Sequence, residues 1–417
     1  MILFGLRAKY LTALAWFYHS TCILVQARNI LFQELLEPMK RRTMPKLNFL
    51  SACIVLLVAS EVLCQNSQSA LDQRTTRPLN MLVLGDSILW GQGLKAEHKS
   101  WYHVKLWLEK NTGRRVIERI EAHSGAVIQR GSLTNNLTST NREVNAGFPS
   151  VHDEIDSALQ FYSDGSRIDL VLVSGCGNDV GVQNLLNASK IEEVDDMTRA
   201  KCGTPMESLL RRIAAAFPAA QVIVTGYYPF FSDQTRNDFI LKALARRFFT
   251  TQRDHSTMSS KEVFERLKVN SKQWYEASNK TLAHAVQKIN DEIGGNRRRF
   301  VFARIEFPSD HSFAAPETRL WGFNRSPFKM MLVILSFGKI LLPSNDEMRK
   351  QRTASCNEVY REQPNETPEQ KKERKAQRLY CRYAALGHPN KKGALLYAET
   401  ITSILKSTIG VAALSAP

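Results

Sequence analysis

Long apolar runs are missing from this chain of 417 residues, as are two common ligand-binding motifs. The most apolar stretches, near residues 47–59 and 330–337, are shorter than the roughly 20 residues that a membrane-spanning helix needs. The seven cysteines form no CxxC pair, which argues against a zinc site, and no Gly-Lys-Ser/Thr phosphate loop is present. We therefore expect a protein without a bound metal or a nucleoside triphosphate.

Acidic residues are scarce relative to basic ones. There are 40 Asp and Glu against 56 Lys and Arg, a formal net charge of +16. Such a charge could favour an acidic polysaccharide, an anionic lipid or nucleic acid. The basic residues are scattered rather than gathered in one stripe, and no nucleic-acid-binding module is recognisable. We expect no nucleic-acid partner and at most a weak contact with a polyanion.

The N-terminal part has the pattern of a targeting sequence. Lys40, Arg41, Arg42 and Lys46 precede the apolar stretch, which ends in the small residues Ala59 and Ser60. This order is typical of a secretory signal peptide. We assign residues 1–43 to an upstream extension of unclear status, 44–64 to a signal peptide cleaved after Ser60 or Cys64, and 65–78 to a polar linker. The expectation is a secreted protein; the alternative is a membrane anchor that stays on the chain.

The cysteines and sequons agree with export. Four cysteines follow the leader, an even number that an oxidising compartment favours. Three pairings are possible, and proximity in the sequence favours Cys176–Cys202 and Cys356–Cys381. Glycosylation sequons begin at Asn136, Asn187, Asn279, Asn324 and Asn365.

Short apolar runs alternate with helical patterns from residue 79 to about residue 410. Near-continuous apolar runs predict strands that are covered on both faces, at 81–84, 116–120, 169–173, 221–225 and 299–303. Helical spacing of apolar residues predicts helices at 101–110, 151–161, 205–216, 261–293 and close to the C-terminus. This alternation predicts an open, mainly parallel five-stranded sheet between helices. Residues of about 308–382 interrupt the rhythm as an insertion, and 411–417 form a tail.

The first predicted strand leads directly into Gly85-Asp86-Ser87. Gly85 would permit a tight turn, Asp86 could cap the next helix, and Ser87 would lie near that helix's N-terminus. Helix-terminal amides favour the negative charge that develops when a serine attacks an acyl carbon. A nucleophilic serine also needs a base and an oxyanion hole, which other strand ends could supply.

Four separated blocks resemble those of the SGNH hydrolases, the GDSL esterase/lipase superfamily. They are "GDSILWG" at Gly85, "AHSGA" at Ala122, "SGCGNDVG" at Ser174 and "GHPNKKG" at Gly387. The resemblance implies a flavodoxin-like three-layer α/β/α fold. It makes Ser87 the nucleophile and His388 the general base, with an oxyanion hole from Ser87, Gly125 and Asn178.

Two positions depart from the family's pattern. Cys176 stands where the third block usually has glycine, and Ala385 stands where an Asp usually precedes the histidine by three residues. The resemblance then requires a backbone carbonyl or a carboxylate elsewhere to orient His388, and Asp310 is a candidate for the carboxylate. Loss of such an orienting carboxylate can lower turnover by orders of magnitude.

The sequence therefore predicts a secreted, monomeric serine esterase with an acyl-Ser87 intermediate and no cofactor. Its substrate would be a small acyl ester, a lipid or an acetylated carbohydrate. The alternative is a weakly active or inactive protein of the same fold that binds an anionic glycan or a membrane surface.

Overall fold

The computed structural model describes residues 77–129, 142–144, 150–236, 258–294, 298–326, 331 and 342–409. The chain separates into two units, Met1–Leu71 and Asp72–Pro417, and every described residue belongs to the second. The proposed leader, Asn136 and most of the apolar segment 330–337 lie outside the described residues.

A parallel sheet forms the centre of this unit. Its five strands have the order β2-β1-β3-β4-β5, and every neighbouring pair is parallel. The strands are β1 (Leu79–Leu84), β2 (Val116–Ile120), β3 (Leu170–Val173), β4 (Gln221–Thr225) and β5 (Phe300–Ala303). The strand order is that of flavodoxin-like folds, in which ligands bind beyond the carboxyl ends of the strands. The predicted fold class is therefore confirmed.

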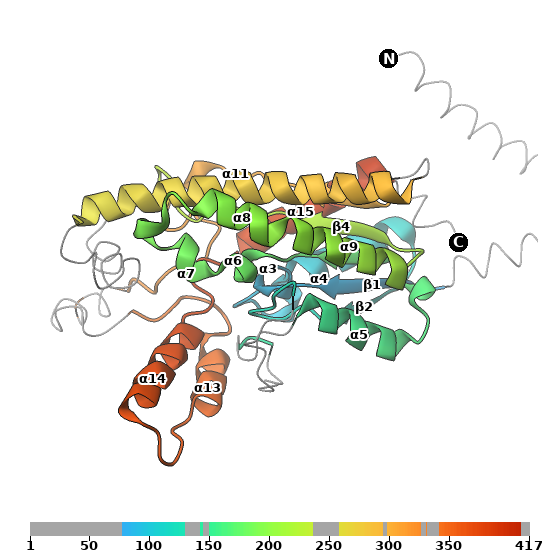
Figure 1. The fold of residues 1–417 in the computed structure, drawn as a ribbon. Coiled ribbons are helices and arrows are strands. Elements are labelled where there is room, and N and C mark those ends of the chain that lie inside the picture. The colour runs from blue at the N-terminus through green and yellow to red at the C-terminus, as the bar shows by residue number, and fades with distance from the viewer. Residues whose placement is uncertain are drawn as a thin grey trace, which may run out of the picture. The chain divides into compact units, whose positions relative to one another are not determined.

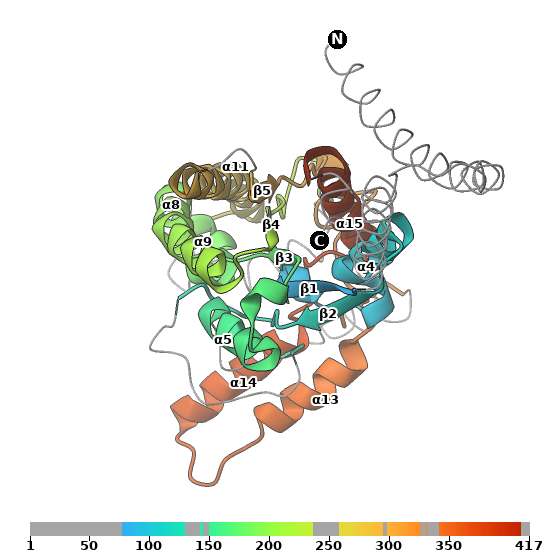
Figure 2. The same ribbon diagram turned by 90° about the vertical axis from the view of Figure 1, so that its right-hand side faces the viewer.

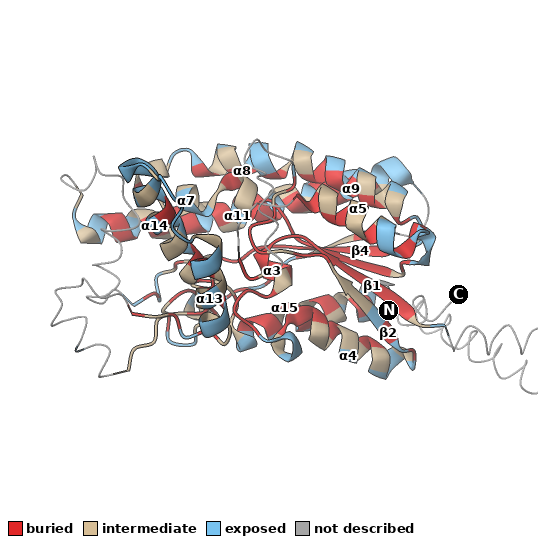
Figure 3. Ribbon diagram, turned by 90° about the horizontal axis from the view of Figure 1, so that it is seen from below, coloured by how far each residue is buried: buried red, intermediate tan, exposed pale blue. Residues whose placement is uncertain are grey.

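Helices cover both faces of the sheet (Figures 1 and 2). On one face lie α4 (Ser100–Thr112) and α15 (Lys391–Ile404). On the other lie α5 (Val151–Tyr162), α8 (Val194–Cys202), α9 (Thr204–Ala216) and α11 (Ser260–Ile293). Figure 3 shows β1 and β4 buried between these two layers, whereas most of the edge strand β2 is only partly buried.

Alternate residues of each strand serve the two faces because the side-chain period of a strand is two. Met81 and Val83 pack with the α4 and α15 side, whereas Leu82 and Leu84 pack with the opposite layer. All six residues of β1 are buried. This double burial accounts for the apolar runs that predicted the strands.

The remaining helices are short or belong to the insertion. The short ones follow strands or turns: α3 (Ser87–Trp90), α6 (Gly177–Val180), α7 (Val182–Leu185), η2 (Ala96–His98), η3 (Gly165–Arg167), η4 (Ala188–Lys190), η6 (Ser309–His311) and the π-helical η7 (Leu405–Ile409). The insertion contributes α13 (Arg349–Val359) and α14 (Pro368–Arg382), a hairpin joined by the Cys356–Cys381 disulfide. Within the described ranges no helix is long and apolar enough to cross a bilayer.

Candidate active site

The turn after β1 holds Ser87 at the first position of α3. Gly85 has a φ of 115°, and a Cβ there would lie 2.1 Å from the Ser174 backbone oxygen, so no other residue fits. Asp86 is the N-cap, and its Oδ1 accepts a hydrogen bond of 3.0 Å from the Ile88 amide. The local sequence Gly-Asp-Ser thus fixes the serine at the carboxyl edge of the sheet.

His388 reaches the same place from the opposite end of the chain. It lies just before α15, whose N-cap is Asn390. Its Nε2 is 2.7 Å from Ser87 Oγ, although the two residues are 301 positions apart. This is the hydrogen-bond distance that a serine and its base require. The structure therefore brings together the two residues that the resemblance predicted as nucleophile and base.

Among the described residues, no carboxylate contacts the other ring nitrogen of His388. Nδ1 is buried and makes no hydrogen bond of standard geometry with a described residue. Burial, followed by the positive charge of Arg352, lowers the pKa of His388 to about 4. The backbone carbonyls of Leu386 and Ala385 act in the opposite direction, as does the Asp346 carboxylate. The ring is therefore neutral at physiological pH and available as a proton acceptor.

The structure does not support Asp310 as the group that orients His388. The Asp310 carboxylate belongs to the turn η6 and lies 3.8 Å from Nε2 of His311. Its side chain is 47% exposed, and none of the contacts recorded for the described residues joins it to His388. The expectation failed because the turn directs this carboxylate to its own sequence neighbour.

Asn178 enters the site from α6, beyond the end of β3. Its side-chain amide donates one hydrogen bond of 2.8 Å to the Ala126 carbonyl, which follows Gly125. An amide nitrogen carries two N–H groups, so one remains for a ligand. Asn178 lines the same cavity as Ser87 and His388. Gly125 precedes Ala126, whose carbonyl binds Asn178, and is not part of the cavity wall.

A buried hydrogen-bond network connects Asp86 to the helix α6, which carries Asn178. Tyr227, which follows β4, donates from its hydroxyl to Asp86 Oδ2 and accepts a 2.9 Å bond from the Gly177 amide. Burial raises the pKa of Asp86, and it raises that of Tyr227 well above the usual value, so the phenol stays protonated as a donor. Sequence reasoning missed Tyr227, since an aromatic residue after a strand is indistinguishable from ordinary core.

The cavity has a volume of about 110 Å³ and a mainly apolar wall. Besides Ser87, His388 and Asn178, the wall includes Val182, Leu185, Leu186, Phe230 and Trp274. The site therefore presents a polar reacting centre beside a hydrophobic chamber, the usual combination in small-molecule sites. No cluster of three or more potential metal ligands is found in the described ranges.

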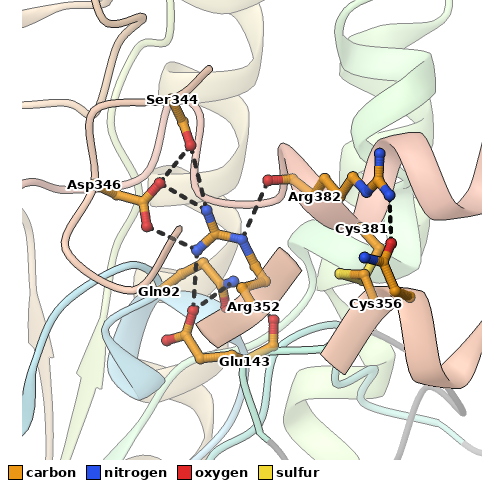
Figure 4. Close-up of a disulfide and its surroundings, with 9 residues drawn as sticks. Gln92, Glu143, Ser344, Asp346, Arg352, Cys356, Cys381 and Arg382 are labelled. Atoms are coloured by element: carbon orange, nitrogen blue, oxygen red, sulfur yellow. Dashed lines mark hydrogen bonds and ion pairs between the residues drawn. A yellow bond between two sulfur atoms is a disulfide. The ribbon is translucent and has the colours of Figure 1, made fainter. Parts of the chain in front are cut away.

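A second cluster, which the sequence did not indicate, surrounds Arg352 of the insertion (Figure 4). Arg352 of α13 is fully buried and pairs with Asp346 at 2.6 Å and Glu143 at 3.1 Å. Glu143 also accepts hydrogen bonds from the Gly93 amide, at 3.2 Å, and from Trp90 Nε1, at 3.1 Å. The insertion is thereby tied to the residues that end the serine's helix.

A family model agrees with this geometry. Residues 83–257 match the GDSL-like Lipase/Acylhydrolase family. Over this segment the chain is similar to the GDSL-like lipases and acylhydrolases. No curated protein gives a significant match.

Solved structures that are similar to this chain have low sequence identity to it. The extracellular lipase of Streptomyces rimosus is 16% identical over 58% of this chain and 88% of its own, with a TM-score of 0.35. The lipase Lip_vut3 from a goat rumen metagenome is 12% identical over 78% and 96%, with a TM-score of 0.36. A family two carbohydrate esterase of Clostridium thermocellum is 12% identical over 57% of each chain, with a TM-score of 0.30. At these scores, the likenesses add nothing to the family match.

The structure forms both expected disulfides, Cys176–Cys202 and Cys356–Cys381. It contradicts one glycosylation site: Asn279 is 2% exposed inside α11 and donates to the Tyr275 and Tyr227 carbonyls. Asn365 is exposed in the turn between α13 and α14. Asn187 caps η4 and Asn324 accepts from the Ser326 amide; both are partly exposed and stay predictions.

Proposed function

We propose that this protein hydrolyses carboxylic esters through a covalent acyl-Ser87 intermediate. The observation that carries the proposal is the 2.7 Å contact between Ser87 Oγ and His388 Nε2 beside an apolar cavity. An ester whose acyl group occupies that cavity would present its carbonyl carbon to the serine. The family match supports ester hydrolysis as the reaction class.

In the first half of the reaction, Ser87 Oγ attacks the carbonyl carbon while its proton passes to His388 Nε2. The resulting tetrahedral oxyanion accepts hydrogen bonds from the free N–H of Asn178 and from the Ser87 and Gly125 amides. Collapse breaks the bond to the alcohol oxygen, which takes the proton from His388 as it leaves. General acid–base transfer of this kind typically contributes 10²–10⁴-fold to the rate.

In the second half, a water molecule replaces the alcohol. His388 accepts one of its protons as the water oxygen attacks the acyl carbon. The Ser87 Oγ–acyl bond then breaks, Oγ recovers a proton from His388, and the carboxylic acid departs. Each step uses protein groups and water.

The lining of the cavity supports an acyl group in the chamber and the alcohol part toward solvent. Phe230 and Trp274 supply apolar surface for the acyl chain, and burial of such surface contributes about 25 cal/mol for each Å² removed from water. We infer secretion from residues 44–64, which lie outside the described structure.

Hydrolysis of p-nitrophenyl acetate by the purified protein and by Ser87→Ala tests this function. We expect Ser87-dependent turnover and a burst of p-nitrophenol that matches the enzyme concentration if deacylation is slower than acylation. Equal rates for the two proteins would remove the esterase assignment. An inactive protein that binds heparin with a steep salt dependence would favour the glycan-binding alternative instead.

A further inference from the structure

Cys176 has an unusual backbone conformation for a residue with a side chain. Its φ is 103° and its ψ is −20°. The other described non-glycine residues with positive φ, namely Ser163, Ala314 and Asn365, have φ values from 54° to 66°. Those values fit the ordinary left-handed region, whereas 103° lies beyond it in space that glycine occupies most readily. The family's usual glycine at this position now has a structural reason.

Two contacts hold the segment in this conformation. The Cys176 side chain is fully buried and bonded to Cys202, the last residue of α8. The next residue, Gly177, donates its amide to the Tyr227 hydroxyl at 2.9 Å. Helix α8 in turn packs on α11. The backbone before Asn178 is thus fixed by a covalent bond on one side and a hydrogen bond on the other.

We propose that the Cys176–Cys202 disulfide is a positioning device for the oxyanion donor Asn178. Cys176 is the N-cap of α6 and Asn178 is the second residue of that helix. A rotation of φ at Cys176 to a negative value would redirect Gly177, break its bond to Tyr227 and move the Asn178 amide out of the cavity. The disulfide prevents this rotation at a position that carries a side chain. This inference depends on the proposed function only for the role of Asn178.

A general stabilising role for the disulfide makes a different prediction. A cross-link that only restricts the unfolded chain acts through loop closure, so every variant that lacks it should lose the same stability and the same activity. A positioning role depends on which residue occupies position 176 after the bond is removed. Two variants without the disulfide can therefore separate the roles.

The matched pair is Cys176→Ala/Cys202→Ala and Cys176→Gly/Cys202→Ala, which differ by a single methyl group. Alanine at position 176 favours negative φ once the bond is gone, whereas glycine tolerates the native value. We expect kcat of the alanine variant to be about tenfold or more below that of the glycine variant, with similar KM. The glycine variant should stay within about threefold of the wild type. Equal kcat values for the pair would overturn the proposal.

Asn178→Ala provides the test of mechanism. If the disulfide acts through Asn178, the alanine and glycine variants should have equal kcat in an Asn178→Ala background. A difference that persists there would show that position 176 acts through another group and would overturn the proposal.

Hydrogen exchange gives a readout that needs no esterase activity. Peptides covering residues 174–181 report on the Gly177 amide, which we expect to lose protection in the alanine variant and to keep it in the glycine variant. Equal exchange in both would contradict the inference. Failure of the proposed function would appear separately, as a wild-type rate that Ser87→Ala does not lower.

Discussion

The acid limb of the pH–activity profile should lie near pH 4 rather than near pH 6.5. His388 must be neutral to accept the Ser87 proton, and burial together with the charge of Arg352 lowers its pKa from 6.5 to about 4. The pH dependence of kcat/KM reports the pKa of the free enzyme's essential base. We therefore expect kcat/KM to be nearly constant from pH 7 down to about pH 5 and to fall by half near pH 4.

The same pKa makes a prediction for folding stability. The folded-state pKa is below the unfolded value, so the unfolded chain binds more protons between pH 4 and 6.5 and stability falls as the pH decreases through this window. At about 1.4 kcal/mol for each pH unit, the loss attributable to His388 is about 3 kcal/mol. This loss of stability is complete below the folded-state pKa, and no loss from His388 is expected above pH 7.

The two measurements use the wild type and His388→Gln. Initial rates on a soluble ester, quenched into alkaline buffer for detection, give the activity limb. Urea unfolding at pH 4, 5, 6 and 7 gives the free energy of unfolding of each protein. Its fall from pH 7 to pH 4 should be smaller for the glutamine variant than for the wild type by about 3 kcal/mol. An activity limb near pH 6.5, or the same pH dependence of stability in both proteins, would refute the assignment of a desolvated His388 ring without a carboxylate partner.

Two further substitutions test the supports of the site. Arg352→Met leaves Asp346 and Glu143 buried without the guanidinium that they share, so the free energy of unfolding in urea should fall by about 3–5 kcal/mol. The exposed Lys350→Met is the control and should change this free energy by less than about 0.5 kcal/mol. Similar values for both variants would contradict a stabilising role of the Arg352 ion pairs. Gly387 has a φ of 77° and a Cβ there would lie 1.7 Å from the Phe230 ring, so Gly387→Ala should displace His388 and lower kcat by about tenfold or more. Gly113→Ala has a comparable φ of 67° but meets no atom within 4 Å, and unchanged kcat is expected for this control.

The centre of the sheet was predictable because β1, β3 and β4 are fully buried. Continuous apolar runs located all five strands to within two residues, and helical spacing located α5, α9 and α11 equally well. The helices of the insertion were not anticipated. Few of their residues are buried and most are polar or charged, so α13 and α14 lack the apolar periodicity on which the prediction depends.

The site was predictable as a set of residues but not as a set of contacts. Motif order was enough to nominate Ser87 and His388, because parallel strands deliver their ends to one edge. The surroundings of Nδ1 of His388 were not predictable, and Asp310 lies against His311 instead, since a contact between distant loops leaves no local signal. Arg352 escaped notice for the same reason: its partners, Asp346 and Glu143, come from two separate segments, and a buried arginine looks like any other in the sequence.

The 301-residue separation between Ser87 and His388 also has a consequence for biosynthesis. All five strands precede residue 304, so a nascent chain can assemble the sheet, with Ser87 in its turn, before the ribosome has made the histidine. The proposed base, His388, is added only afterwards, together with α15. A product truncated after β5 would therefore hold the proposed nucleophile without its proposed base.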